Sequence, residues 1–257
     1  MNRCPRRAAA AALCVLPLCL ATPAIPAQAD IPRSAKKIAK LLEDHYRHAQ
    51  TLRAIFLERY SEGPRDAHLE SGTVYFQRPG RMRWEYESPE KKLFVADGKT
   101  IWFYVPADRT VTRAPVKVSA DWRMPLALLT GQANLMRLCS KVELSDHPLG
   151  LSPGHAVLRC LPKGEARSKV SAGNDEPEDS TELPGAGGFT EVLIEVDSAS
   201  GELARVTIRQ RGGVALGYQF GDWRENLPLP EDLFHFQPPA GVAIVTGGAS
   251  RETSRFE

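Results

Sequence analysis

The stretch from Leu52 to Val116 constrains the fold most, because large apolar side chains recur there with a period of two, as they do in β-strands. Six short runs of this kind follow one another, at residues 52–60, 71–77, 81–87, 92–97, 99–106 and 110–116. Turn-forming pairs such as Ser88-Pro89 and Asp97-Gly98 separate the runs, and an Asp-Gly pair is a strong signal for a two-residue β-hairpin loop. The sequence therefore predicts an antiparallel meander.

Several of these runs carry large apolar side chains on both faces, as in TIWFYV, TVYF and KLFVA. In a single curved antiparallel sheet, one face then has to close over an interior and the other has to be covered. Further strands follow in the C-terminal half, for a total of about eleven. A closed or half-closed barrel around a cavity is one interpretation, and an ordinary packed sandwich core is the other.

Helical spacing replaces the strand rhythm in two places. Residues 34–49 carry one apolar stripe, which predicts an N-terminal helix. In residues 124–138, Pro125 can open a short helix that carries Leu126 and Leu129. Both helices are natural lids for a barrel.

The C-terminal half resumes the strand pattern, with hairpins expected near Gly150 and at Ser200-Gly201. Between them, residues 164–188 are rich in Gly, Pro, Ser and acidic side chains and almost lack apolar ones. Such a composition cannot bury a core, so we predict a disordered surface loop within a single domain of residues 30–257.

Residues 1–29 have the organisation of a secretory signal peptide: a basic start, an apolar run and the small-x-small end Ala27-Gln28-Ala29. We expect cleavage after Ala29 and a periplasmic location. A lipoprotein signal at Cys19 is the alternative, but Leu18 stands where that pattern needs a small residue. Three of the 33 basic residues lie in the signal, which leaves 30 basic against 31 acidic residues. This balance gives no electrostatic footprint for nucleic acid or for an anionic membrane.

The cysteines are consistent with export. Three of the five lie in the signal, and the remaining two are Cys139 and Cys160, on strand-like runs around a turn-rich segment. An even pair in an exported protein favours a disulfide. Two buried thiols on neighbouring strands are the alternative.

The patterns that could indicate catalysis or metal binding each lack a group that the chemistry requires. Residues 150–154 match the G-x-S-x-G pattern of serine hydrolases, but Pro153 follows the serine and has no N–H for an oxyanion hole. His45 and His48 could share a metal ion on one helix, but no third ligand has a convincing spacing. We therefore expect no enzyme activity, no metal and no cofactor.

Four segments together resemble the outer-membrane lipoprotein carrier family (LolA). They are SGTVYFQRPGRMRWEY, SPEKKLFVADGKTIWFYVP, MPLALL and the terminal FHFQPPAGV, and residues 34–139 follow the order of the family closely. The resemblance implies an unclosed antiparallel β-barrel whose helices form a lid over an apolar cavity. It also implies a monomeric carrier that takes lipoproteins from an inner-membrane ABC-type extruder, binds their acyl chains and hands them to an outer-membrane acceptor.

The resemblance assigns roles to single residues. Arg78 corresponds to the lid latch, the arginine that hydrogen-bonds the lid in the closed, empty state. The positions that line the cavity or the lid are Leu52, Phe56, Met82, Trp84, Leu126 and Leu129. Two residues depart from the family pattern, since Glu58 stands where a glutamine is usual and Met82 replaces an aromatic. A related half-barrel that senses lipoproteins or carries another lipid or glycolipid is the alternative function.

Overall fold

The computed structural model of the protein describes residues 34–63, 66–116, 129–130, 135–145, 152–162 and 189–246. All of them belong to one compact unit, residues 31–257. The expected signal peptide, Leu126 and the loop at 164–188 lie outside the described residues. So do most of the residues of the second expected helix.

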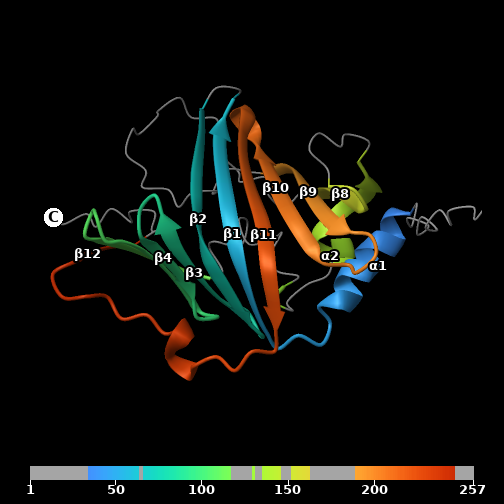
Figure 1. Ribbon diagram of the computed structural model, residues 1–257. Helices are drawn as coiled ribbons and strands as arrows, with labels where there is room; N and C mark the ends of the chain where they lie inside the picture. Colours follow the sequence, from blue (N-terminus) through green and yellow to red (C-terminus); the bar gives the residue numbers. More distant parts are fainter. Residues whose placement is uncertain are drawn as a thin grey trace, which may run out of the picture. The chain divides into compact units, whose positions relative to one another are not determined.

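The described residues form twelve strands and a few short helices (Figure 1). The helices are α1 (Ala35–His45), α2 (Leu135–Leu138), and the 3-10 helices η3 (Arg211–Gly213) and η4 (Glu231–Phe234). The strands are β1 (Thr51–Glu62), β2 (Asp66–Gln77), β3 (Arg81–Ser88), β4 (Lys92–Ala96), β5 (Thr100–Val105), β6 (Thr110–Pro115), β7 (Cys139–Leu144), β8 (His155–Pro162), β9 (Phe189–Asp197), β10 (Leu203–Gln210), β11 (Val214–Glu225) and β12 (Ala243–Thr246). In this part of the chain, no helix combines the length and the apolar character that crossing a bilayer requires.

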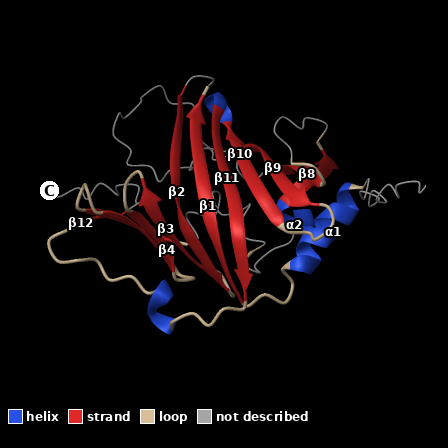
Figure 2. Cartoon of the chain, in the orientation of Figure 1, coloured by secondary structure: helices blue, strands red, loops and turns tan. Residues whose placement is uncertain are grey.

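All twelve strands belong to one sheet, in the order β12-β6-β5-β4-β3-β2-β1-β11-β10-β9-β8-β7. Neighbouring strands are antiparallel except for β12, which runs parallel to β6. The sheet is open, because its edge strands β12 and β7 pair with different neighbours and not with each other (Figure 2). This confirms the predicted mainly-β, unclosed fold, with one strand more than expected.

Side chains of β1 alternate between a buried and an exposed face of the sheet. Leu52, Ala54 and Phe56 are buried, whereas Ile55 and Leu57 are 48% and 42% exposed. We call the buried side the inner face. The apolar core continues on it from β4 to β8, so burial of this one face provides most of the hydrophobic stabilisation of the domain.

Helix α1 adds its apolar stripe to the core on the inner face. Ile38, Leu42 and Tyr46 are fully buried, and α1 contacts β7 and β8. The helix ends at His45, before the end of the predicted stripe at Ala49. Tyr46 and Ala49 are still buried, because the chain turns back into the core before β1 begins at Thr51.

The C-terminal segment covers part of the outer face, which accounts for the apolar residues on both sides of β5. The ring of Phe236 lies 5.8 Å from that of Trp102 and 5.8 Å from that of Tyr104. The guanidinium of Arg113 also stacks on Trp102, 5.1 Å from the centroid of its ring. The TIWFYV run is therefore packed on both faces.

The turn between β4 and β5 differs in detail from its sequence expectation. Residues 97–99 separate β4 from β5, so the loop has three residues instead of two. The carboxylate of Asp97 accepts hydrogen bonds from the backbone N–H groups of Lys99 and Thr100, both at 2.7 Å, and this holds the turn. At the β7 edge of the sheet, Cys139 and Cys160 form a disulfide that joins β7 to β8, with a Cα–Cα distance of 5.5 Å.

Candidate functional site

Trp84 lies at the centre of an aromatic cluster on the inner face. Its ring centroid is 4.8 Å from that of Phe56 and 5.0 Å from that of Tyr218. Phe76 and Phe220 follow at 6.1 Å and 6.2 Å. These rings come from the adjacent strands β3, β2, β1 and β11, so the register of the sheet gathers residues that are far apart in the sequence.

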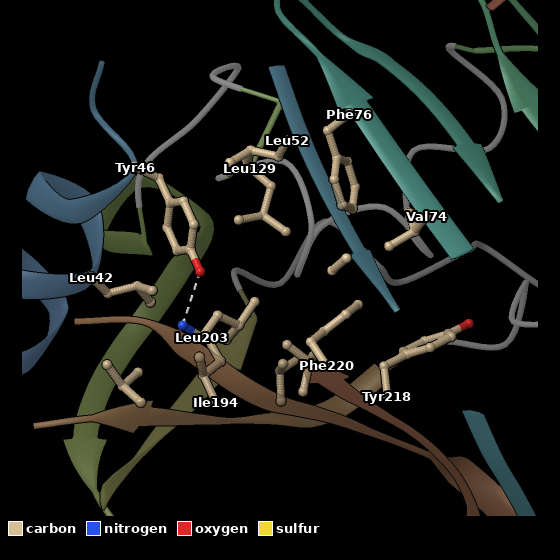
Figure 3. Packing of buried hydrophobic residues seen from close by; sticks show 14 of the residues in the cluster. Leu42, Tyr46, Leu52, Val74, Phe76, Leu129, Ile194, Leu203, Tyr218 and Phe220 are labelled. Atoms are coloured by element: carbon tan, nitrogen blue, oxygen red, sulfur yellow. Dashed lines mark hydrogen bonds between the residues drawn. The ribbon is translucent and has the colours of Figure 1, made fainter. Parts of the chain in front are cut away.

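The residues that the resemblance assigned to a cavity wall lie together in this region. Leu52, Phe56, Met82 and Trp84 are all buried on the inner face and belong to one apolar cluster. Leu129 belongs to the same cluster and is fully buried. Figure 3 shows Leu129 beside Leu52, between Tyr46 and Phe76. The side chain of Leu126 lies outside the described residues.

Gly72 allows two of the rings to meet across a strand. In the sheet register it stands between Phe56 of β1 and Tyr86 of β3, whose ring centroids are 5.0 Å apart. A Cβ atom at this position would come within 1.8 Å of the backbone oxygen of Glu85. The glycine is therefore required by the close approach of β2 to β3.

Helix α1 and Leu129 together cover one end of the aromatic cluster, and we call them the α1–Leu129 cover. Tyr46, directly after α1, anchors the cover to the sheet, because its hydroxyl accepts a hydrogen bond of 3.0 Å from the backbone N–H of Leu203 (Figure 3). Burial raises the pKa of the Tyr46 hydroxyl far above its usual value, so this group stays protonated.

Arg78 connects the end of β2 to both parts of this cover. Its guanidinium donates to the backbone oxygens of Tyr46 at 2.6 Å and of Arg47 at 2.9 Å, and its Nε donates to the oxygen of Leu129 at 3.4 Å. The last carbonyls of a helix lack intrahelical partners, and a cation there also interacts favourably with the helix dipole. Partial burial lowers the pKa of Arg78, but a guanidinium remains charged in proteins.

Beyond the aromatic cluster, the inner face carries a row of polar side chains, which we call the polar row. It consists of Glu58, Glu70, Tyr86, Lys92 and Tyr218, from β1, β2, β3, β4 and β11. The register places Glu58 opposite both Tyr218 and Glu70, and Lys92 forms an ion pair with Glu70. Sequence reasoning noticed Glu58 only as a departure from the family and missed its neighbours, which strand pairing alone brings together.

Glu58 is the residue of the polar row whose protonation state changes near neutral pH. The Tyr86 hydroxyl donates a hydrogen bond of 2.7 Å to its carboxylate. Burial raises the pKa of Glu58 to about 7, with a further increase from Glu70. The hydrogen bond from Tyr86 and the charge of Lys92 act in the opposite direction. Burial also raises the pKa values of Tyr86 and Tyr218, so both hydroxyls stay neutral.

The histidines and acidic residues do not assemble a metal site in the described part of the chain, where no three His, Cys, Asp or Glu side chains converge in a suitable group. His45 instead lies 3.3 Å from the carboxylate of Glu225. On β8, His155 lies 3.0 Å from the buried carboxylate of Glu195. Both contacts join neighbouring elements of the fold.

The open sheet, with its aromatic inner face and helical cover, places the chain in the class of unclosed β-barrel proteins. Residues 47–148 match the family model described as "Outer membrane lipoprotein carrier protein LolA". This match confirms the resemblance to that family found in the sequence.

Curated relatives extend this similarity over most of the chain. The outer-membrane lipoprotein carrier protein of Nitrosospira multiformis is 28% identical over 208 residues, which cover 80% of this chain and 86% of the relative. The protein of the same name from Nitrosomonas europaea is 29% identical over 234 residues, covering 90% and 95%. Among solved structures, a LolA superfamily protein from Nitrosomonas europaea aligns with a TM-score of 0.40 and 11% identity, covering 78% of this chain and 97% of that one.

Proposed function

We propose that this protein is a periplasmic, non-enzymatic carrier that binds the acyl chains of lipoproteins. In this function it receives lipoproteins from an ABC-type extruder of the inner membrane and delivers them to an acceptor at the outer membrane. The match to the family model and the names of the curated relatives support this proposal. The signal-like residues 1–29 support the location.

The observation that carries the proposal is the contact of Arg78 with the α1–Leu129 cover. Burying an acyl chain is favourable by roughly 0.8 kcal/mol per methylene, so a carrier with an open apolar face would bind cargo without releasing it. A hydrogen bond from a charged group contributes about 1.5–3 kcal/mol. The bonds from Arg78 to the cover therefore favour the empty, closed state and offset part of the binding energy, so that cargo can leave again.

Replacing Arg78 by leucine tests this role. The Arg78→Leu variant keeps the apolar face and loses the donors that hold the cover, so we expect it to bind lipoprotein and to transfer it poorly. Arg81→Leu is the matched control, since Arg81 is exposed and its side chain bonds only to Gln77 among the described residues. The assay measures release of lipoprotein from inner-membrane vesicles and its transfer to outer-membrane vesicles. Transfer by Arg78→Leu at the wild-type rate refutes the latch role.

Mass spectrometry of the material that co-purifies with the mature protein tests the cargo class. Acylated lipoprotein supports the proposed carrier. A free lipid or glycolipid supports instead the related half-barrel module that was the alternative from the sequence. Turnover of the bound lipid during incubation contradicts the non-enzymatic function.

A further inference from the structure

The polar row lies directly beyond the aromatic cluster on the same face. Glu58 follows Phe56 by two residues on β1, so both side chains point to the inner face. Glu58 is only half-buried, whereas Phe56 is 3% exposed. A molecule that packs an apolar part on the aromatic cluster can therefore place a polar group at Glu58.

The charges of the polar row are not balanced when Glu58 is ionised. Lys92 pairs with Glu70, and no salt bridge in the described part of the chain involves Glu58. Its carboxylate receives a hydrogen bond from the neutral hydroxyl of Tyr86. A half-buried carboxylate without an ion-pair partner of its own is unfavourable, and a positive group supplied by a ligand would compensate it.

The rings around Glu58 suit a cation as well. Phe56 and Tyr86 meet at 5.0 Å on one side, and Tyr218 of the next strand stands opposite Glu58 in the register. Aromatic faces combined with a carboxylate are a common binding arrangement for ammonium groups.

Trp84 supplies a second, independent observation. Its ring contacts those of Phe56 and Tyr218, and it is 2% exposed. Its indole Nε1–H is buried without a hydrogen-bond partner among the described residues. A buried donor normally has a partner, so this group can donate a hydrogen bond to a ligand oxygen beside the polar row.

We propose that Glu58, with the rings of Phe56, Tyr86 and Tyr218, binds a primary ammonium group that is attached to acyl chains. This inference rests on the proposed function, because it places the acyl chains of the cargo on the aromatic cluster. Two molecules carry this chemistry: a diacylated lipopeptide with a free α-amino group, and a phospholipid with an ethanolamine headgroup. The ester oxygens near either ammonium group match the donor of Trp84.

The test compares two pairs of probes that differ in the amine. The first pair is an S-diacylglyceryl-cysteine lipopeptide with a free N-terminus and the same lipopeptide after N-acetylation. The second pair is phosphatidylethanolamine and phosphatidylglycerol with identical chains. Displacement of the neutral fluorophore N-phenyl-1-naphthylamine from the mature protein at pH 8 gives the relative affinities. The proteins are the wild type, Glu58→Gln, and the matched control Glu62→Gln, which changes an exposed glutamate on the same strand.

We expect the wild type and Glu62→Gln to prefer an amine-bearing probe by about tenfold, the combined effect of a partly buried ion pair and a cation–π contact. Glu58→Gln should lose this preference and bind the N-acetylated lipopeptide as the wild type does. A preference in the lipopeptide pair alone identifies an amino terminus as the ligand, and one in the phospholipid pair alone identifies an ethanolamine headgroup. Equal affinities within both pairs, or a preference that persists in Glu58→Gln, overturn the inference while acyl binding stands. If none of the four probes displaces the fluorophore, the acyl-chain function itself is wrong.

Discussion

Glu58 should make the stability of the fold depend on pH in an unusual direction. Its pKa is about 7 in the folded protein against a usual value of 4.5, chiefly because burial disfavours the charged carboxylate. Between these two pH values the folded state holds a proton that the unfolded chain has lost. The stability contributed by this group is therefore full below pH 4.5 and is lost as the pH rises through 7. Most carboxylates of folded proteins act in the opposite sense.

The magnitude follows from the two pKa values. A carboxyl that titrates at about 7 when folded and at 4.5 when unfolded destabilises the protein by roughly 2.5 kcal/mol more at pH 8 than at pH 5. In Glu58→Gln, a neutral side chain of nearly the same shape replaces the carboxyl, and the amide can still accept the hydrogen bond from Tyr86. The variant should therefore gain about 2.5 kcal/mol relative to the wild type between pH 5 and pH 8.

The assay is urea unfolding of both proteins at pH 5 and at pH 8, with the disulfide intact. Taking the difference between variant and wild type at each pH removes the titration of all groups that the two proteins share. Glu62→Gln, whose side chain is exposed, serves as the control and should change by less than about 0.5 kcal/mol. A relative gain for Glu58→Gln below about 1 kcal/mol would show that the carboxylate is solvated in the folded protein, and it would refute the reasoning from burial.

Two further predictions concern the frame around the site. Gly72→Ala should lower the free energy of unfolding by about 1–3 kcal/mol, because the new Cβ has to displace the Glu85 backbone. Gly217→Ala is its control, since a Cβ there meets its nearest atom at 3.7 Å, and equal thermal shifts for the two variants would contradict the packing argument. Replacing Cys139 and Cys160 together by serine should cost roughly 3 kcal/mol in urea unfolding, from the entropy of the loop that the disulfide closes. Reducing the disulfide of the wild type should reproduce this loss, whereas the reductant should not change the stability of the double variant. A reduced wild type that is as stable as the oxidised one would contradict the stabilising role of the disulfide.

The strand pattern was predictable because it depends on neighbours in the sequence. The period of two from Leu52 onward correctly indicates strands, and it also separates the buried Phe56 from the exposed Leu57. The same reasoning gave no prediction for the direction of the last strand. A short run such as Ala243–Thr246 has no preference for parallel or antiparallel pairing, and its pairing with β6 depends on the path of the preceding segment.

The site was predictable only where a family resemblance named residues one by one. The hydrophobic period and the composition of the sequence could not predict the hydrogen-bond partners of Arg78, because its acceptors are backbone carbonyls some thirty and fifty positions away in the sequence. The end of α1 at His45 was missed as well, because the apolar stripe continues to Tyr46 and Ala49, which stay buried after the helix has ended. The polar row depends on register across five strands, which a single sequence does not display.

The position of β1 in the middle of the sheet has a consequence for how the chain folds. β1 pairs on one side with β2, which follows it directly, and on the other side with β11. Thr51 donates a hydrogen bond to the backbone oxygen of Leu227, 176 residues away in the sequence. The meander of β1 to β6 can form from local contacts. The edge of β1 that pairs with β11 stays unpaired, however, until almost the whole domain has been synthesised. Closing so large a loop is slow, so an unprotected edge of β1 is the point at which a chaperone or a second unfolded chain would compete with folding.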